Sequence, residues 1–352
     1  MRKACHLLLF FMIIGIFWSS IYSAELSFKG YMFGEYYFVL SHHSGEINAG
    51  GIRGRHGFWF RRIYFTTDAK FSDKIKGRLR LEFNSPGKFP FDSSDKLVPF
   101  VKDAYISFSC FGQEIVFGIF STPTWGRIEN IWGYRSLEKT PLDLMKMGSS
   151  RDFGIGLKGN LDKGKTLSYK LMLGNGASTK GETNKHKKIY GSLAWNPLQG
   201  MTLEVYADYE SLPNNKNYCV LQAFGSYADN WGRIGAMWAR RHLDEADTGY
   251  DYDLISAFSV LKAAKELEII ARFDRMFGNG FRSKFNGSGV SYVPFADNPG
   301  APFNLIIGAV SWNVAKDVWL IPNIKYVIYD HPEGGEKPGE DIYANLTVFF
   351  KF

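Results

Sequence analysis

The last twelve residues, 341–352, have the sequence DIYANLTVFFKF, in which every second side chain is apolar. The alternating apolar positions are Ile342, Ala344, Leu346, Val348, Phe350 and Phe352. Successive side chains of a strand point to opposite faces, so this pattern predicts a strand with one apolar and one wet face. A soluble domain can contain such a strand, but a strand that stops at an aromatic residue is typical of the last strand of a bacterial outer-membrane barrel.

The opposite end of the chain indicates export. Residues 1–24 have the layout of a secretory signal peptide, with Arg2 and Lys3 at the start and an apolar run of twelve residues at 7–18. That run is too short for a membrane-spanning helix. We therefore expect removal of residues 1–24 and a single outer-membrane β-barrel porin domain at residues 25–352.

The composition fits an exported barrel. The chain has 42 basic and 35 acidic residues, and loss of Arg2 and Lys3 leaves 40 against 35, a mild excess that does not indicate a nucleic-acid partner. Of its 352 residues, 58 are aromatic and 37 are glycine, as expected for aromatic-rich strands joined by glycine-containing turns. The two cysteines of the expected mature chain, Cys110 and Cys219, are too few for a disulfide framework.

Alternation of apolar and polar residues recurs along the whole chain. In residues 75–83, Ile75, Leu79, Leu81 and Phe83 share one face, and Lys76, Arg78, Arg80 and Glu82 share the other. The same pattern assigns Phe303, Leu305 and Ile307 to a lipid-facing side. Sixteen strands are expected, at residues 26–40, 58–71, 75–84, 98–110, 114–120, 151–159, 165–173, 187–195, 201–209, 217–228, 231–241, 250–260, 266–276, 302–314, 318–329 and 341–352. An even number suits a closed up-and-down barrel with both ends in the periplasm.

The expected connections alternate between tight turns and long loops. The long loops are expected at residues 41–57, 85–97, 121–150, 174–186, 210–216, 242–249, 277–301 and 330–340. Short periplasmic turns and long extracellular loops are typical of outer-membrane barrels, whereas a soluble sandwich does not sort its loops in this way. Closure follows because no water in the hydrocarbon layer can satisfy the open edge of a sheet.

A barrel of sixteen strands leaves an aqueous lumen. Lys76, Arg78 and Arg80 would form a ladder of positive charge about 13 Å tall on its wall. Such a ladder would attract anions and hold them weakly at successive sites. The alternative, which the sequence leaves open, is that these cations pair with Asp103 or Glu82 on neighbouring strands.

The longest expected loop, residues 121–150, has a helical pattern at 140–147 and is expected to cover or enter the channel, because long structured loops are often functional. Its Arg127 and Arg135 are candidate pore-lining residues. Arg62 and Arg272, on strands, complete the set of expected anion-binding side chains with Lys76, Arg78 and Arg80.

Five short motifs occur in order along the chain. They are FRRIYF at 60–65, KDAYI at 102–106, VFGIFSTP at 116–123, SRDFGI at 150–155 and LGNG at 173–176. On these motifs nearly all of the expected mature chain resembles the phosphate-selective porins O and P. The resemblance implies a sixteen-stranded, usually homotrimeric channel in the Gram-negative outer membrane, surrounded by lipid and lipopolysaccharide, with an inward-folding third loop. It implies passive diffusion of small anions, with phosphate or polyphosphate as the narrower alternative.

Three other functions remain as alternatives: a non-selective general diffusion porin, an outer-membrane barrel enzyme, and an adhesin. No nucleophile elbow of the Gly-x-Ser-x-Gly type and no Cys/His cluster with metal-site spacing occurs in the sequence, so neither enzymatic activity nor a cofactor is expected. The adjacent His42 and His43 could bind a metal ion, but a solvated loop is the simpler interpretation, so no metal site is expected.

Overall fold

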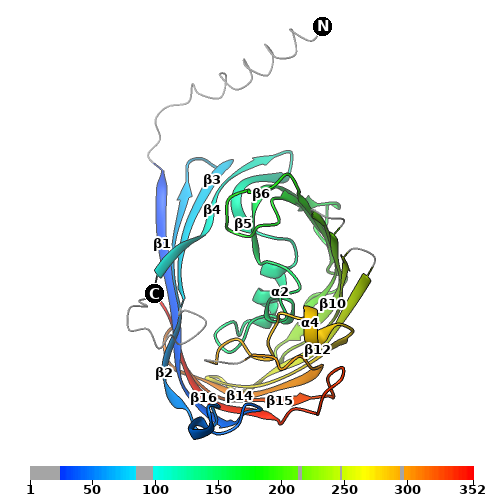
Figure 1. Ribbon diagram of the computed structural model, residues 1–352. Coiled ribbons are helices and arrows are strands. Elements are labelled where there is room, and N and C mark those ends of the chain that lie inside the picture. The colour runs from blue at the N-terminus through cyan, green and yellow to red at the C-terminus, as the bar shows by residue number, and fades with distance from the viewer. Residues whose placement is uncertain (1–23, 85–97, 213–215, 246–247, 294–296) are drawn as a thin grey trace.

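The computed structural model is a closed barrel of sixteen antiparallel strands, in which β1 pairs with β16 (Figure 1). It describes residues 24–84, 98–212, 216–245, 248–293 and 297–352. The strands are β1 (Glu25–Ser41), β2 (His56–Lys70), β3 (Ile75–Asn84), β4 (Val98–Cys110), β5 (Gln113–Ser121), β6 (Arg151–Asn160), β7 (Leu167–Gly174), β8 (Lys188–Trp195), β9 (Met201–Leu212), β10 (Lys216–Asp229), β11 (Gly232–Glu245), β12 (Thr248–Ala264), β13 (Leu267–Gly278), β14 (Phe303–Ala315), β15 (Val318–Tyr329) and β16 (Asp341–Lys351). The predicted fold class is confirmed, whereas residues 1–23 of the predicted signal peptide lie outside the described residues.

Two of the predicted long loops are wrong. Residues 210–216 and 242–249 were expected to be loops, but β9 continues to Leu212 and β11 continues to Glu245, and each pairs with the next strand up to these ends. These strand ends extend past the region of apolar and polar alternation, so the sequence stops signalling a strand while the backbone pairing continues. The predicted loop at 85–97 lies outside the described residues.

The outer surface of the barrel is apolar and its inner surface is polar. Leu79, Val205 and Ile269 are 47%, 56% and 47% exposed on the outer face. Their strand neighbours Arg80 and Glu204 point inward and form ion pairs there. A closed sheet with an apolar exterior satisfies its backbone groups within the sheet and fits the hydrocarbon layer, which places the protein in the outer membrane of a Gram-negative bacterium.

The barrel closes where Phe352 meets Gly30. The N–H of Gly30 donates to the carbonyl oxygen of Phe352 at 2.7 Å, and the N–H of Phe352 donates back at 3.0 Å. A Cβ atom at Gly30 would lie 2.3 Å from the ring of Phe352 and 2.7 Å from the carbonyl oxygen of Tyr64. Only a residue without a side chain permits this close approach, so Gly30 allows the seam to close.

Two loops fold into the barrel instead of projecting from it. Loop L3, residues 122–150, contains α2 (Trp125–Trp132) and α3 (Pro141–Leu144). Loop L7, residues 279–293 and 297–302, contains α4 (Phe281–Lys284), and Figure 1 shows α2 and α4 inside the ring of strands. A single turn of 3-10 helix, η1 (Ile47–Ala49), lies in the first loop. Among the described residues, no helix has the length and apolar character needed to cross a membrane.

Loops L3 and L7 bring an apolar core into the lumen. The ring of Trp132 packs edge-on against that of Phe258 on β12, with the centroids 5.2 Å apart. The lipid-facing assignment of Phe303, Leu305 and Ile307 on β14 is therefore wrong, because these three side chains point inward and are completely buried. At this wall the lumen is filled with protein, so the inward face of the strand is apolar as well.

Candidate functional site

Three arginines of the barrel wall hold loop L3 in place. Arg233 donates to the carbonyl oxygen of Trp132 at 3.1 Å, Arg241 donates to that of Lys146 at 2.8 Å, and Arg272 donates to that of Lys139. Loop carbonyls inside a barrel have no sheet partner, and these guanidinium groups supply the missing donors. Arg272 also binds Asp274 through two nitrogen atoms, at 3.0 and 2.6 Å. The structure therefore places this predicted anion-binding residue under loop L3, where it anchors the loop.

A buried ion pair joins both loops to the wall. The carboxylate of Glu138 in L3 lies 2.9 Å from the ammonium group of Lys325 on β15, and both side chains are completely buried. Ser291 of L7 donates to the same carboxylate through its hydroxyl group and, at 3.2 Å, through its N–H. Burial alone would raise the pKa of Glu138, but Lys325, Ser291 and Arg61 outweigh it and lower the pKa to about 2. We call the set Glu138, Ser291 and Lys325 the L3 latch.

Next to the L3 latch, Tyr292 of L7 lies among four cations, of which Arg62 is the most distant at 5.8 Å. The guanidinium carbon of Arg61 is 3.8 Å from the centre of the tyrosine ring, and that of Arg135 in L3 is 5.1 Å from it. The ammonium group of Lys325 is 5.6 Å away. The negative face of an aromatic ring attracts cations, and this attraction is stronger where water is excluded. Tyr292 thus helps to hold L7, L3 and the wall together.

The opposite wall, formed by β1 to β6, carries ion clusters of one repeated type. Asp68 lies 2.6 Å from Arg78 and 2.5 Å from Lys29. Asp103 pairs with Arg80, at 3.3 Å, and with Arg151. Glu82 pairs with Lys102, at 3.0 Å, and with Arg62.

In each cluster one acid lies between two cations, so each cluster keeps one positive charge. The three clusters contain six basic and three acidic side chains, a net charge of +3. We call these nine residues the basic wall. Arg78, Arg80 and Glu82 alternate along β3, so the clusters follow one another at steps of about 7 Å. Arg80 pairs with Asp103, as the alternative from the sequence has it, whereas Arg78 pairs with Asp68 and Lys76 lies outside these clusters; the role of the three cations as anion sites stays a prediction.

Two β-bulges shape the basic wall. In the pairing of β1 with β2, Phe33 faces Arg62 and Gly34 faces Phe60, so Arg61 has no opposite residue. In the pairing of β3 with β4, Arg80 faces Asp103 and Leu81 faces Val101, so Lys102 has none. An extra residue on one strand breaks strict alternation. In both places two consecutive charged residues therefore reach the interior.

Strict alternation does not predict that Arg61 and Lys102 face the interior, because both lie at these bulges. Arg61 is buried against Glu35 at 3.0 Å, and Lys102 completes a cluster of the basic wall. The sequence holds one signal of such bulges, which is two adjacent charged residues within an otherwise alternating strand. The pairs Arg61-Arg62 and Lys102-Asp103 are both of this kind.

The edge of loop L3 supplies charges of both signs. Arg135 lies 3.3 Å from Glu129 and 3.3 Å from Asp143. Burial lowers the pKa of Lys139 to about 8; Asp143 opposes this shift, and Arg135 and Arg62 add to it. Arg62 belongs to the basic wall, so the wall and this edge of L3 act on each other electrostatically. Arg135 and Lys139 balance Glu129 and Asp143, which leaves the loop edge neutral.

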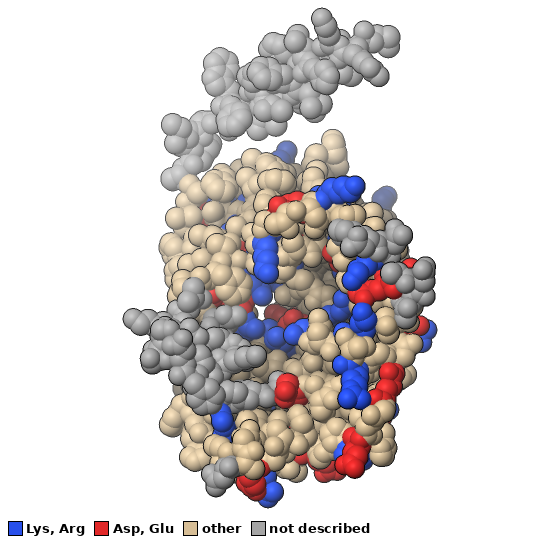
Figure 2. All heavy atoms as spheres, in the orientation of Figure 1, with Lys and Arg blue, Asp and Glu red and all other residues tan. Residues whose placement is uncertain are grey.

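An opening remains between the folded loops and the strands. Figure 2 shows it near the middle of the molecule, with basic and acidic side chains around it. Lys76 and Arg78 line a cavity of about 380 Å³ beside the turn that joins β2 to β3. Arg127 lines a second cavity with Lys158 and Lys170, and it pairs with Glu204 at 3.3 Å. The seven predicted pore residues thus occupy four places: the basic wall for Arg62, Arg78 and Arg80, the short-turn rim for Lys76, loop L3 for Arg127 and Arg135, and the wall covered by L3 for Arg272.

No protein-family model and no curated protein matches the chain. Solved structures do resemble it. An anion-selective porin from Comamonas acidovorans has a TM-score of 0.65 at 10% identity over 94% of this chain and 100% of that one. The outer membrane channel DcaP of Acinetobacter baumannii has a TM-score of 0.66 at 10% identity, over 95% and 99% of the chains. OmpT, an outer membrane protein of Vibrio cholerae in its trimer form, has a TM-score of 0.61 at 10% identity, over 94% and 100%. These likenesses show a porin-type barrel fold, and the resemblance to the phosphate-selective porins O and P stays a prediction.

Proposed function

We propose that the protein is a porin through which small anions diffuse passively across the outer membrane. The observation that carries this proposal is the basic wall, in which every acid is shared by two cations. Charges in a narrow channel bounded by low-dielectric walls are screened far less than surface charges, so they concentrate counter-ions. The likeness to an anion-selective porin supports the same conclusion.

The pairing within the basic wall also suits conduction. An anion must bind well enough to enter a site and weakly enough to leave it. A cluster with one surplus charge attracts an anion less strongly than two unpaired cations would. Successive clusters at steps of about 7 Å then offer a series of similar weak sites along β3.

Three narrower parts of the proposal rest on resemblance. Phosphate or polyphosphate as the preferred permeant follows from the five sequence motifs. A homotrimer follows from those motifs and from the trimer form of the Vibrio cholerae protein. A channel that acts by diffusion, and not by catalysis or adhesion, is the role that the porin-type fold supports. Native mass spectrometry in mild detergent tests the trimer, and a monomer under those conditions would remove it.

The decisive experiment measures reversal potentials in a potassium chloride gradient across a planar bilayer. We expect the wild-type channel to prefer chloride. The variant Arg78→Gln/Arg80→Gln/Lys102→Gln removes the three surplus charges and leaves each acid with one partner, namely Lys29, Arg151 and Arg62. Its preference for chloride should fall toward none.

The matched control removes three charges elsewhere. Lys262, Lys265 and Lys316 are exposed beside short turns, and their triple change to Gln should leave the reversal potential within error of wild type. A wild-type channel that prefers potassium would contradict the proposal, and equal permeation of both ions would indicate a general diffusion porin. Competitive block of chloride current by phosphate would support the narrower phosphate hypothesis.

A further inference from the structure

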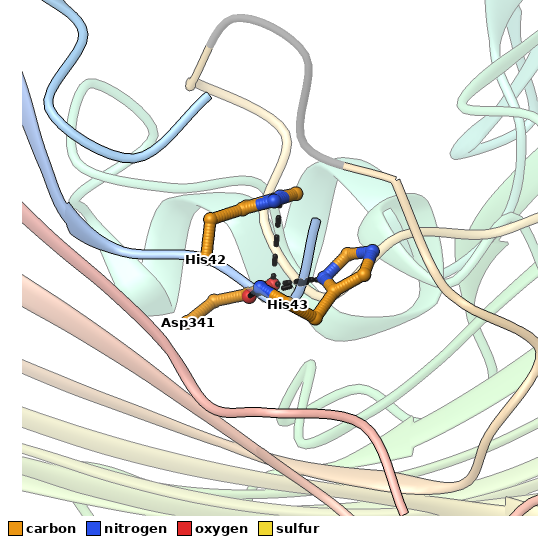
Figure 3. Close-up of side chains that lie close together, drawn as sticks. All are labelled: His42, His43 and Asp341. Carbon is orange, nitrogen blue, oxygen red and sulfur yellow. Dashed lines mark hydrogen bonds and ion pairs between the residues drawn. The ribbon is translucent and has the colours of Figure 1, made fainter. Parts of the chain in front are cut away.

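Two histidines and an aspartate meet on the long-loop side of the barrel seam. His42 and His43 directly follow β1, and Asp341 is the first residue of β16. They are separated by about 300 positions in sequence, but β1 and β16 are neighbours, with Ser41 opposite Ile342. Figure 3 shows both imidazole rings directed at the carboxylate of Asp341. One donor atom from each of the three residues lies within 4.8 Å of the other two.

The carboxylate of Asp341 is the centre of this group. The Nδ1 atom of His43 lies 3.0 Å from one of its oxygens, and the Nε2 atom of His42 lies 3.8 Å from the other. Asp341 is 1% exposed and His42 is 6% exposed, so the group is shielded from water although it lies at a loop.

The Nε2 atom of His42 is the unexplained feature. It is buried and has no hydrogen-bond partner among the described residues, and its distance to Asp341 is too long for a hydrogen bond. A buried polar atom without a partner costs about 1–3 kcal/mol. Such an atom, directed at a carboxylate beside a second imidazole, is in the arrangement expected of a ligand-binding group.

We propose that His42, His43 and Asp341 bind a divalent transition-metal ion, with zinc as the first candidate. Imidazole nitrogen and carboxylate oxygen are ligands that zinc accepts in a tetrahedral site with three protein ligands and one further position. Calcium and magnesium prefer all-oxygen ligand sets, so two imidazoles argue against them.

The distances allow such a site with small movements. Ligands about 2.0–2.1 Å from a tetrahedral zinc ion lie about 3.4 Å from one another. The donor atoms, within 4.8 Å of one another, therefore have to approach by at most about 1.4 Å. Rotation of the His43 ring, which is at the surface of the group, can supply much of this movement.

Each proposed ligand already contacts a residue outside the ligand set, which we call its outer partner. The Nδ1 atom of His42 lies 2.7 Å from the hydroxyl oxygen of Ser44, and the Nε2 atom of His43 lies 3.6 Å from a carboxylate oxygen of Asp297. The hydroxyl group of Tyr329 donates to Asp341 at 2.6 Å. Metal-bound histidines and carboxylates are usually oriented by such contacts, which makes this environment typical of a metal site.

The protonation of His42 is compatible with metal binding. The N–H of Ser44 donates to its Nδ1 atom at 3.1 Å, so the proton of the neutral ring is on Nε2. When the ion binds Nε2, that proton is released from Nε2, and Nδ1 can take up a proton and donate to the hydroxyl oxygen of Ser44. Burial lowers the pKa of His42, which keeps its ring in the neutral form that binds metals.

The test uses the full chain without a histidine tag, folded in detergent and titrated with zinc chloride by calorimetry. We expect one ion per chain. His43→Gln and His42→Gln, which each remove one ligand, should weaken binding by at least about 100-fold, since loss of an outer partner alone costs about 10- to 100-fold. Cobalt chloride provides a second readout, because a four-coordinate site gives intense visible absorption that both variants should lose.

The matched control is His242→Gln. His242 also pairs with an aspartate, Asp251, at 2.8 Å, but the described residues place no third ligand beside them. This variant should bind zinc like wild type. Wild-type protein that binds no zinc at 100 μM, or binding that survives both His42→Gln and His43→Gln, would overturn the proposal. Heat-modifiable gel mobility of all variants establishes that each barrel is folded, and none of these outcomes depends on the selectivity of the channel.

Discussion

Neutralising Glu138 should release loop L3 while the barrel remains closed. Glu138→Gln preserves the size of the side chain and its acceptor for Ser291, but it removes the counter-charge that lies 2.9 Å from the buried ammonium group of Lys325. Loops L3 and L7 are held at this point from different parts of the chain, so loss of the charge should weaken both attachments. The barrel strands keep all their backbone pairing.

Two independent arguments give the free energy that loop L3 loses when the charge of Glu138 is removed. The pKa of Glu138 falls from an ordinary value of 4.5 to about 2 in the folded protein, and each tenfold change in proton affinity corresponds to about 1.4 kcal/mol, which gives about 3 kcal/mol. Removal of one partner of a buried ion pair costs about 3–5 kcal/mol. Because the pKa is lowered on folding, this stabilisation is present above pH 4.5 and is lost as the pH falls toward 2.

Hydrogen exchange followed by mass spectrometry measures the release directly. A loss of about 3 kcal/mol raises the open population of L3 roughly 100-fold, so peptides covering residues 134–147 should exchange about 100-fold faster in Glu138→Gln. The control is Glu129→Gln in the same loop, whose partly exposed pair with Arg135 should contribute no more than about 1 kcal/mol. Equal exchange rates in the two variants would refute the reasoning.

A double variant separates the charge from the shape of the L3 latch. Glu138→Gln/Lys325→Met removes both members of the ion pair, and replacement of a buried pair by groups of similar volume is often nearly neutral. Exchange of L3 should then return most of the way to the wild-type rate. A double variant that exchanges as fast as Glu138→Gln would mean that the unpaired ammonium group is not the cause.

Three further outcomes are expected. Leu79→Arg, on the lipid-facing side, should lower the free energy of unfolding in lipid vesicles by about 2–4 kcal/mol, and wild-type stability would contradict the face assignment. A rise in pH from 7 to 9 should weaken chloride preference, in part because Lys139 loses its proton near pH 8, and Lys139→Arg, which stays charged, should show a smaller change. Gly30→Leu should reduce the folded fraction seen by gel mobility, because its Cβ would lie 2.7 Å from the carbonyl oxygen of Tyr64, whereas Gly308→Leu, which has open space, should not.

The strands and most of their faces could be predicted from sequence because alternation is a local property. The expected range 75–84 coincides with β3, and 318–329 coincides with β15. The length and helical pattern of L3 left open whether it covers or enters the channel, and its inward fold was implied by the resemblance to a porin family. The assignment failed for Phe303, Leu305 and Ile307, because the filling of the lumen beside β14 is set by loops distant in sequence.

The roles of the charged residues were harder to predict from the sequence. Arg80 and Arg272 look alike in sequence, since each alternates with apolar residues on a strand. Arg80 belongs to the basic wall, whereas Arg272 is covered by L3 and bonded to its backbone. The difference depends on which wall the loop packs against, and nothing local to either arginine encodes that choice. The same applies to His42 and Asp341, which meet only because the first and last strands pair.

The β-bulge at Lys102 connects this irregular geometry to the proposed selectivity. With strict alternation, Asp103 would face the lumen and Lys102 would face lipid, where a charge costs about 2–4 kcal/mol near the membrane centre. Glu82 would then keep Arg62 as its partner, and that cluster would be neutral. The bulge turns Lys102 inward to Glu82 at 3.0 Å, which converts a neutral pair into a cluster with one surplus positive charge. One additional residue in β4 thus removes a charge from the lipid face and adds it to the basic wall, so the local irregularity and the surplus charge of this cluster have a common cause.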